Sequence, residues 1–556
     1  MRARTVAALT ALVLVLAGCA GLPRSGPVNP GPELGSEPVV PDFSFFPDGP
    51  QPGATPRQIV EGFVSAATNP EDGWATARLF LAPDVREEWD PLSGVTIDEL
   101  GEREIAELDD DTVEIEAEPI ADLDAAGAYS AVADGGASFT YELAEQEDGE
   151  WRISVAPTGL LLDAESFDTV FRSASIMYFD PAWRFLVPDV RWYPERTNLA
   201  THIAQAIVEG VPSPWLAESV VSAVPEDVAL SQQAVTVEAG VAQVELSSSA
   251  LEADPVALGR MLRQLQGSLG GTGITGVELL VDGAALSVQP ARVESTSIDA
   301  QPLVLAADGF GYLSGDEVTP IEGLSEAVEG LGIVSAALGR GAEAVAVRTE
   351  GGAFRVDAES GVTPVDARAG MIDPAIDPDG AIWSVPAGSP GRLQATTADG
   401  EPIAIEGAWS GFDGIEAMQV SRDGTRMAAI VRSGATSWLT VSGIIRDADL
   451  RPVGLGEPVR LNALAGESGD VAWLDDQTLA AVVEGTDAAL VREQTVGGLS
   501  VQEDAPGPEI AALAAGATSA SVRALVPEGD LYQRRGIAWT LAAEGVAVLG
   551  SQLGSG

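Results

Sequence analysis

The spacing of hydrophobic positions changes several times along the chain, and each spacing predicts different elements. Thr55-Pro56 has the residue types of a helix cap and a first helical position, and apolar residues then recur at helical spacing up to Ala67. A second helix is expected over 74–81. Within 112–155, apolar and polar residues alternate in four runs, which is typical of half-buried strands. Helices followed by an antiparallel sheet predict an α+β domain over residues 55–160.

Mixed spacing continues in a second unit over residues 175–290. Two strand-like segments open it, and a helix capped by Asn198 follows. After two short strands near residues 235–246, Asp254-Pro255 begins a helix with leucines along one stripe. A strand over 277–283 then closes the unit. This βαββαβ-like order predicts a second α+β domain.

Short strands separated by Gly and Asp turns fill residues 301–556. A pattern of strand, tight turn and strand recurs at 375–385, 419–431 and 471–483, with a fainter copy at 338–347. The turn aspartates of the three clear copies, Asp379, Asp423 and Asp475, lie 44 and 52 residues apart. Repeats of this length suit propeller blades, and a pitch of about 40 to 45 residues predicts an all-β propeller of about six blades.

The N-terminus has the layout of a bacterial export signal. Two arginines precede an apolar run from Val6 to Leu16, which is about half of the roughly 20 residues that span a bilayer. Leu16-Ala17-Gly18-Cys19 resembles the lipobox of bacterial lipoproteins, which implies a signal peptide over 1–18 and a lipid on the thiol of Cys19. The alternatives are an ordinary signal peptide that contains a cysteine and an unprocessed anchor. Residues 19–54 are proline-rich and predict a lipidated, semi-rigid spacer.

The composition of the chain argues against several classes of binding site and catalytic site. The formal charge is −54, so nucleic acid is not expected as a partner. All basic residues are arginine. A Walker-type phosphate loop is therefore not expected, because it needs a lysine. The chain has one histidine and one cysteine, whereas zinc sites take several such ligands. We therefore expect no cofactor, no metal ion and no catalytic residues.

The remaining candidate motifs favour structural roles. Gly271–Gly276 has the glycine spacing of a dinucleotide loop, but it follows a predicted helix and precedes a strand, which favours a cap and turn. His202 lies beside an apolar helix stripe, so a boundary position is favoured over a catalytic base. Asp109–Asp111 and Asp377–Gly380 could begin calcium sites, yet both are better explained as turns. Four aromatic residues are expected in the core, with lining of a glycan or peptide groove as the alternative: Trp183, Trp192, Tyr193 and Trp215.

Three resemblances extend this interpretation. The segment 147–157 resembles the closing hairpin of small cone-shaped domains, and the second unit resembles the GerMN domain. The order of lipobox, spacer, cone-like domain, GerMN-like domain and propeller is similar to that of the actinobacterial LpqB lipoproteins over essentially the whole chain.

The LpqB resemblance implies a lipid-anchored protein on the outer face of the cytoplasmic membrane. It also implies a role as accessory binding protein for the extracellular domain of an MtrB-like sensor histidine kinase, and hence in MtrA/MtrB signalling, cell-wall homeostasis and division. No catalytic residues come with it, and the protein is not expected to be an enzyme. The alternative function is a cell-wall glycan-binding protein or hydrolase that uses an acidic groove.

Overall fold

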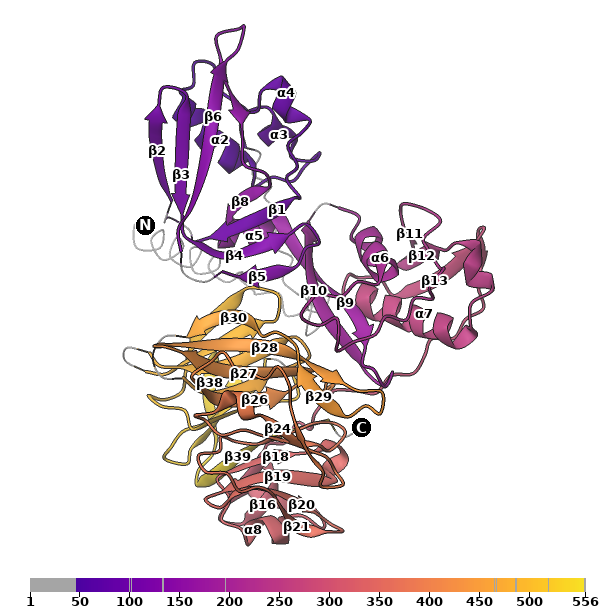
Figure 1. The fold of residues 1–556 in the computed structure, drawn as a ribbon, viewed down its shortest axis with the longest axis vertical. Coiled ribbons are helices and arrows are strands. Elements are labelled where there is room, and N and C mark those ends of the chain that lie inside the picture. Colours follow the sequence, from indigo (N-terminus) through magenta and orange to yellow (C-terminus); the bar gives the residue numbers. More distant parts are fainter. Residues whose placement is uncertain are drawn as a thin grey trace, which may run out of the picture. The chain divides into compact units, whose positions relative to one another are not determined.

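The computed structural model describes residues 47–554 apart from 100, 102, 133–134, 196, 465, 467, 486–487 and 519. Cys19, the export signal and most of the spacer therefore lie outside the described residues. Residues 47–556 form one compact unit, in which three modules follow one another along the chain (Figure 1).

The first module packs helix α2 (Pro56–Ala66) against two four-stranded sheets. One sheet has the strand order β2-β3-β6-β7 and the other β5-β4-β1-β8. Helix α2 begins with a capping box between Thr55 and Gln58 and buries Ile59, Val60 and Phe63. The remaining elements are α3 (Ala75–Arg78), α4 (Pro83–Arg86), β1 (Gly94–Asp98), β2 (Glu104–Asp109), β3 (Thr112–Ala117), β4 (Pro119–Asp124), β5 (Tyr129–Ala131), β6 (Ala137–Glu145), β7 (Trp151–Val155) and β8 (Leu160–Asp163).

Helix α3 is shorter than the sequence predicts. Trp74 has a left-handed backbone, with φ of 60°, and its buried ring donates a hydrogen bond to the carbonyl of Ala67, so no helix extends through it. At the other end, Phe80 and Ala82 exchange backbone hydrogen bonds with Ile153 of β7. The chain around Leu81 thus pairs with the sheet instead of continuing the helix.

The second module has the predicted order of elements. The hairpin of β9 (Phe171–Phe179) and β10 (Leu186–Pro194) is followed by α6 (Leu199–Glu209), and Asn198 caps this helix. Strands β12 and β13 are parallel and are joined through α7 (Pro255–Gly270), whose leucine stripe is buried. The other elements are β11 (Thr236–Glu238), β12 (Val241–Glu245), η1 (Ser248–Leu251), β13 (Gly276–Val281) and β14 (Ala284–Ala285). Helix α5 (Ala164–Val170) precedes β9 and buries Phe167 and Val170 in the core of the first module.

The third module is a propeller whose described residues form six blades of four main strands (Figure 1). The last strand of the chain, β39 (Val546–Gln552), pairs with β15 (Leu303–Ala306) and with β18 (Ser335–Leu338), so it completes the first blade and closes the ring. The prediction of a propeller of about six blades is confirmed, as is the strand-turn-strand repeat.

The blades follow one another in chain order. The first contains β39, β15, β16 (Gly309–Ser314) and β17 (Glu317–Pro320), and the second contains β18, β19 (Ala344–Thr349), β20 (Gly352–Asp357) and β21 (Gly361–Asp366). The third contains β22 (Ala375–Ile376), β23 (Ile382–Ser384), β24 (Gln394–Thr396) and β25 (Pro402–Ala404). The fourth contains β26 (Gly414–Val420), β27 (Arg426–Ser433), β28 (Thr436–Arg446) and β30 (Val459–Leu464), with β29 (Pro452–Leu455) added to the end of β28. The fifth contains β31 (Ser468–Trp473), β32 (Thr478–Val483), β33 (Leu490–Thr495) and β34 (Ser500–Asp504), and the sixth contains β35 (Ala512–Ala515), β36 (Val522–Leu525), β37 (Leu531–Arg535) and β38 (Ala538–Ala543). Short helical segments are α8 (Ser325–Glu329), η2 (Arg340–Ala342) and η3 (Pro390–Arg392).

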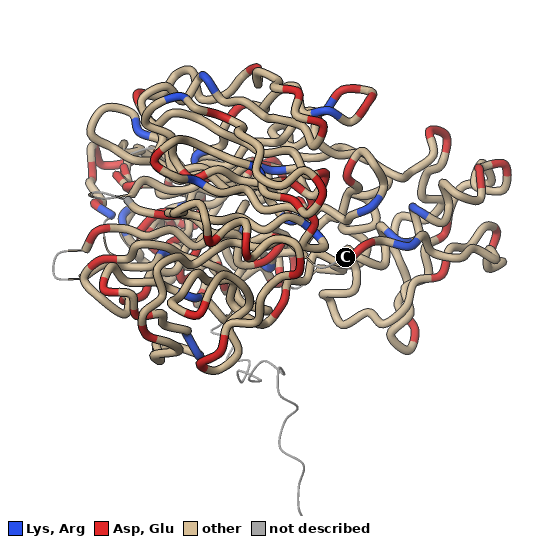
Figure 2. The backbone as a smooth tube through the Cα atoms, turned by 90° about the horizontal axis from the view of Figure 1, so that it is seen from below, with Lys and Arg blue, Asp and Glu red and all other residues tan. Residues whose placement is uncertain are grey.

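Several of the few cations stabilise contacts between blades. Acidic positions outnumber basic ones along the described chain (Figure 2). Arg426 is 1% exposed in its side chain, forms an ion pair with Asp423, and donates to the carbonyl of Asp476 in the next blade. Arg422 donates to the carbonyls of Trp473 and Leu474. Because one guanidinium presents five donors, it can satisfy acceptors of two blades at once.

Candidate interaction site at the junction of the modules

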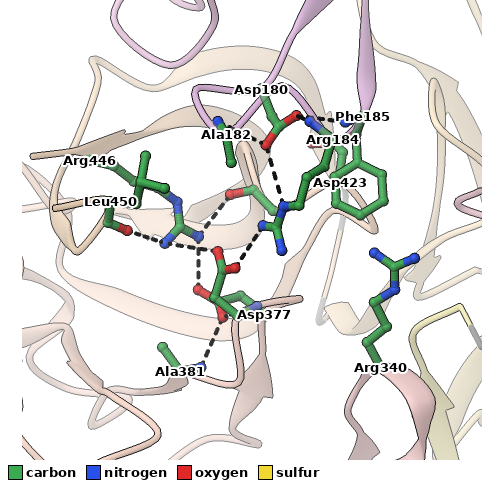
Figure 3. Close-up of polar contacts among 12 residues, drawn as sticks. Asp180, Ala182, Arg184, Phe185, Arg340, Asp377, Ala381, Asp423, Arg446 and Leu450 are labelled. Atoms are coloured by element: carbon green, nitrogen blue, oxygen red, sulfur yellow. Dashed lines mark hydrogen bonds and ion pairs between the residues drawn. The ribbon is translucent and has the colours of Figure 1, made fainter. Parts of the chain in front are cut away.

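A polar link joins the second module to the propeller (Figure 3). The carboxylate of Asp180 accepts backbone hydrogen bonds from Arg184 and Phe185, both at 2.6 Å, and so shapes the loop between β9 and β10. Burial raises the pKa of Asp180, against the lowering effect of these donors. The loop presents Arg184 to the propeller, where its guanidinium lies 2.6 Å from a carboxylate oxygen of Asp379.

The propeller side of this link is the turn between β22 and β23, one of the predicted repeats. Asp377 is fully buried and accepts hydrogen bonds from the backbone of Asp379 at 3.0 Å and of Ala381 at 2.9 Å. Arg446 lies 2.9 Å from Asp377 and 3.5 Å from Asp379. Asp379 is therefore held between two arginines, one from each module, and the turn interpretation of this motif is confirmed.

Further contacts stabilise the boundary between the second module and the propeller. Arg340 forms an ion pair with Glu294 and lies over the ring of Phe185, 4.8 Å from its centroid. The hydroxyl of Thr296 donates to the carboxylate of Asp476 at 2.8 Å. The backbone N–H of Glu294 donates to the carbonyl of Arg184 at 2.8 Å, so the segment between the second module and the first propeller strand is bonded to both of the parts that it connects.

Trp192 contacts all three modules. Its backbone N–H donates to the carbonyl of Gly127 in the first module at 2.8 Å, and its indole N–H donates to the carbonyl of Gly497 in the propeller at 2.8 Å. The ring packs 4.7 Å from Phe167, inside the hydrophobic core of the first module. A Cβ atom on Gly127 would lie 2.5 Å from the carbonyl oxygen of Trp192, so this contact requires glycine.

A second close approach lies between the loop at residues 213–219 and strand β28. A Cβ atom on Gly443 would lie 2.8 Å from the carbonyl oxygen of Trp215 and would overlap the hydroxyl of Ser219. A Cβ atom on Gly456 would lie 3.2 Å from the same carbonyl. The loop therefore rests on the propeller where Gly443 of β28 and Gly456, just after β29, have no side chain.

A cavity of about 510 Å³ lies where the three modules meet. This volume falls in the range of about 300–1,000 Å³ that is typical of ligand pockets. The residues that line it come from β5 and its preceding turn, from β10 and the 213–218 loop, and from the segments around β30 and the end of β33: Asp124, Ala128, Tyr129, Ser130, Pro188, Asp189, Val190, Ser213, Pro214, Trp215, Glu218, Gly456, Glu457, Pro458, Val459, Leu461, Val496 and Gly497. We call this space the junction cavity.

Carboxylates and aromatic rings give the junction cavity its chemical character. Asp189 is buried, pairs with Arg191 at 2.9 Å and accepts two hydrogen bonds from Ser213, both at 2.7 Å. Burial raises the pKa of Tyr129, which keeps its hydroxyl protonated. Among the described residues that line the cavity there is no basic side chain. The arrangement suits binding of a ligand.

A smaller cavity of about 130 Å³ lies along the propeller axis, lined by the six innermost strands. Asp470 borders it and accepts backbone hydrogen bonds from Val471 and Leu513, both at 2.8 Å. Burial of the carboxyl group raises the pKa of Asp470 to about 7, with a further contribution from the charge of Asp373. The cavity is smaller than typical ligand pockets.

The structure also places the other candidate residues. His202 stacks on Tyr193 with ring centroids 5.3 Å apart, and burial lowers the pKa of the imidazole. The glycines of Gly271–Gly276 follow α7 and precede β13, as the cap and turn prediction requires. Asp109–Asp111 form the turn between β2 and β3. Within the described ranges, no group of three or more His, Cys, Asp or Glu side chains is placed to hold a metal ion, and no helix there has the length and apolar character to cross a membrane.

The sequence predicts four aromatic residues in the core, with lining of a groove as the alternative. Of these four, only Trp215 lines the junction cavity, and Trp192 is buried. The sequence interpretation missed Tyr129, Glu218 and Glu457. One signal was available for the interface, because glycine inside a strand often marks the close approach of another backbone, and Gly443 is such a residue.

Three family models match the chain. The model described as lipoprotein LpqB, N-terminal domain, matches residues 49–168, and the model described as lipoprotein LpqB beta-propeller domain matches residues 308–548. A model of sporulation and spore germination matches residues 175–287, which confirms the GerMN-like assignment. The lipoprotein LpqB of Bifidobacterium longum is 24% identical over 539 residues that cover 91% of each chain. The chain belongs to the LpqB lipoprotein family.

Other comparisons cover smaller parts of this LpqB-family chain. The lipoprotein LpqB of Cutibacterium acnes is 29% identical over 293 residues, which are 52% of this chain and 49% of that relative. The chain thus spans about half the length of this relative. A chain in the crystal structure of a nidogen/laminin complex is 11% identical, with a TM-score of 0.34, and the likeness covers 45% of this chain and 97% of that one.

The junction cavity draws on all three family regions of this LpqB-family chain. Tyr129 lies in the first matched region, Trp215 in the second and Glu457 in the third. The cavity is therefore built by all three modules of this chain together.

Proposed function

We propose that this LpqB-family chain is a membrane-anchored accessory protein that binds the extracellular domain of an MtrB-like sensor histidine kinase and biases its signalling state. The observation that carries the proposal is the junction cavity, an acid-lined and aromatic space of about 510 Å³ built by all three modules. Such a space suits binding, and any influence on the kinase must come from tighter binding to one of its two signalling states.

The anchor is part of the proposal. Cys19 is the acylated residue, the signal peptide is 1–18, and residues 19–54 are the spacer that carries the domains at 55–160, 175–290 and 301–556 on the outer face of the cytoplasmic membrane. One acyl chain holds a protein only marginally, whereas two hold it stably, so a diacylated cysteine suffices.

The anchor is tested by Cys19→Ala in the native host. Because the thiol is the acceptor of the lipid, we expect the variant to be released from the membrane fraction or to retain its signal peptide, with no acyl mass on the N-terminal peptide. Cys19→Ser is the matched control for side-chain size and is expected to behave like Cys19→Ala. A variant that stays processed and in the membrane fraction would refute the assignment.

The partner is tested with the whole chain purified in detergent and the purified extracellular domain of the kinase. Calorimetry is expected to give saturable heat, and the two proteins are expected to co-purify, whereas the sensor domain of an unrelated kinase gives neither. Reconstitution of both full proteins in vesicles then measures kinase autophosphorylation with and without the lipoprotein. Absence of both heat and co-purification contradicts the proposed function.

A hydrolase is the second candidate, and one observation favours it: the raised pKa of Asp470 beside Asp373 in the propeller cavity. A carboxyl group with a pKa near neutrality can act as a general acid. This function predicts turnover of peptidoglycan fragments that Asp470→Asn abolishes. The small volume of the cavity, about 130 Å³, makes binding at the junction cavity the better supported function.

A further inference from the structure

Each module contributes one carboxylate without a cationic partner to the junction cavity. Asp124 comes from the first module, Glu218 from the second and Glu457 from the propeller, and none of them forms an ion pair with a described residue. Asp124 accepts hydrogen bonds from the backbone of Ala126 and Ala128, at 2.9 and 2.8 Å, which orient it and leave its charge uncompensated. Glu218 and Glu457 are exposed.

Like charges that converge without a counter-charge repel one another, and a ligand cation relieves this repulsion. Some buried carboxylates elsewhere in the chain have an arginine partner, as Asp423 has Arg426 and Asp377 has Arg446. The fourth carboxylate of the cavity, Asp189, follows the same rule through Arg191. The three exposed carboxylates of the junction cavity have no such partner among the described residues.

Aromatic rings border the same space. Trp215 is half-buried between the cores of the second module and the propeller, and Tyr129 is half-buried on β5. Cations are attracted to the faces of such rings, most strongly to tryptophan, and aromatic walls with nearby carboxylates are the common way to bind a guanidinium or ammonium group. Pro188, Pro214 and Pro458 complete an apolar wall that would lie along an aliphatic side-chain stem.

We propose that the junction cavity binds an arginine or lysine side chain that a partner protein presents on an extended segment. This inference rests on the proposed binding function and names the chemistry of the partner. Charge complementarity selects the occupant, because the lining carries carboxylates from three modules and no basic side chain among the described residues. A cavity of this volume is larger than one side chain, so neighbouring residues of the segment also enter it.

The test uses the whole chain in detergent and two fluorescent pentapeptides, acetyl-Gly-Arg-Gly-Arg-Gly-amide and the same peptide with citrulline in place of arginine. Citrulline keeps the shape of arginine and removes its charge. Anisotropy titrations are expected to show binding of the arginine peptide that weakens with salt, and binding of the citrulline peptide that is about tenfold weaker.

Matched variants locate the binding. Glu218→Gln with Glu457→Gln is expected to weaken the arginine peptide about fivefold, the sum of two partly exposed ion pairs. Glu226→Gln with Glu317→Gln removes the same charge from exposed positions of the second module and the propeller outside the cavity, and it is expected to change nothing. All four substitutions are at exposed side chains, so folding is preserved, and thermal unfolding verifies this.

Several results would overturn the inference. These are equal binding of both peptides, equal losses in both double variants, and binding of a chito-oligosaccharide probe without any binding of the arginine peptide. The kinase domain is titrated against the same variants. If it binds every variant equally, the inference fails while the proposed function stands. If it does not bind but the arginine peptide still depends on Glu218 and Glu457, the inference stands and the proposed function fails.

Discussion

Substitution of Gly443 by alanine tests whether the second module rests on the propeller as described. The added methyl would overlap the hydroxyl of Ser219 and lie 2.8 Å from the carbonyl of Trp215. Overpacking costs about 1–3 kcal/mol, and the loss of glycine from the unfolded chain returns about 0.4–1 kcal/mol. The net effect is a loss of about 1–2 kcal/mol in stability. Gly443 does not have a left-handed backbone, so alanine adds no backbone strain there, and we attribute the loss to the contact between the 213–219 loop and β28.

Hydrogen exchange of the loop amides is the appropriate assay. Leu216 donates to the carbonyl of Ser213 and Ser219 to that of Leu216, both at 2.9 Å, so these amides report whether the loop keeps its conformation on the propeller. If the contact weakens by about 1.4 kcal/mol, they exchange about tenfold faster.

The control is Gly411→Ala, where nothing lies within 4 Å of the added atom. It is expected to leave loop exchange unchanged and to stabilise the chain by about 0.4–1 kcal/mol. Adding Ser219→Gly to Gly443→Ala removes one of the two overlaps and is expected to restore part of the protection. If loop exchange in Gly443→Ala equals that in Gly411→Ala, the close approach is refuted.

Three further predictions follow from the described contacts. Arg426→Met leaves Asp423 buried without its partner and is expected to destabilise the propeller by about 3–5 kcal/mol, measured as a lower Tm; a loss below about 1 kcal/mol contradicts the contact. The folded-state pKa of Asp470 is raised to about 7, so the wild type loses stability as the pH rises from the unfolded-chain value of about 3.9 to 7; Asp470→Asn removes this slope, and parallel Tm profiles of the two proteins would contradict it. Trp192→Phe keeps an aromatic ring and removes the donor to Gly497, which is expected to cost about 1 kcal/mol in chemical unfolding, against about 3–5 kcal/mol for Trp192→Ala.

Elements with a strong local signal could be predicted from the sequence. The Asp-Gly turns of the propeller repeat, as at Asp379-Gly380, mark the point where an innermost strand reverses, and burial of both faces makes the flanking strands continuously apolar. Helix α7 carries both a cap at Asp254 and a regular leucine stripe. The sequence predicts a helix that begins at Trp74, but this residue has a left-handed backbone and its buried ring bonds to Ala67, a contact that the helical spacing does not show.

The candidate site could not be predicted in the same way, because its residues are far apart in sequence and have no shared period. Asp124, Glu218 and Glu457 are three of many acidic residues in the chain, and only the docking of the modules brings them together. What sets them apart is that they line one cavity whose described residues include no basic side chain, and this is visible only in the folded chain. The glycine at 443 is the exception, since glycine weakens the interior of a strand such as β28 and often marks the close approach of another backbone. If docking at Gly443 builds the cavity, then a substitution there should also weaken the arginine peptide, although it changes no residue that lines the cavity. Weaker peptide binding after this substitution would mean that binding depends on how the modules pack together. Unchanged binding would instead indicate a site that belongs to a single module.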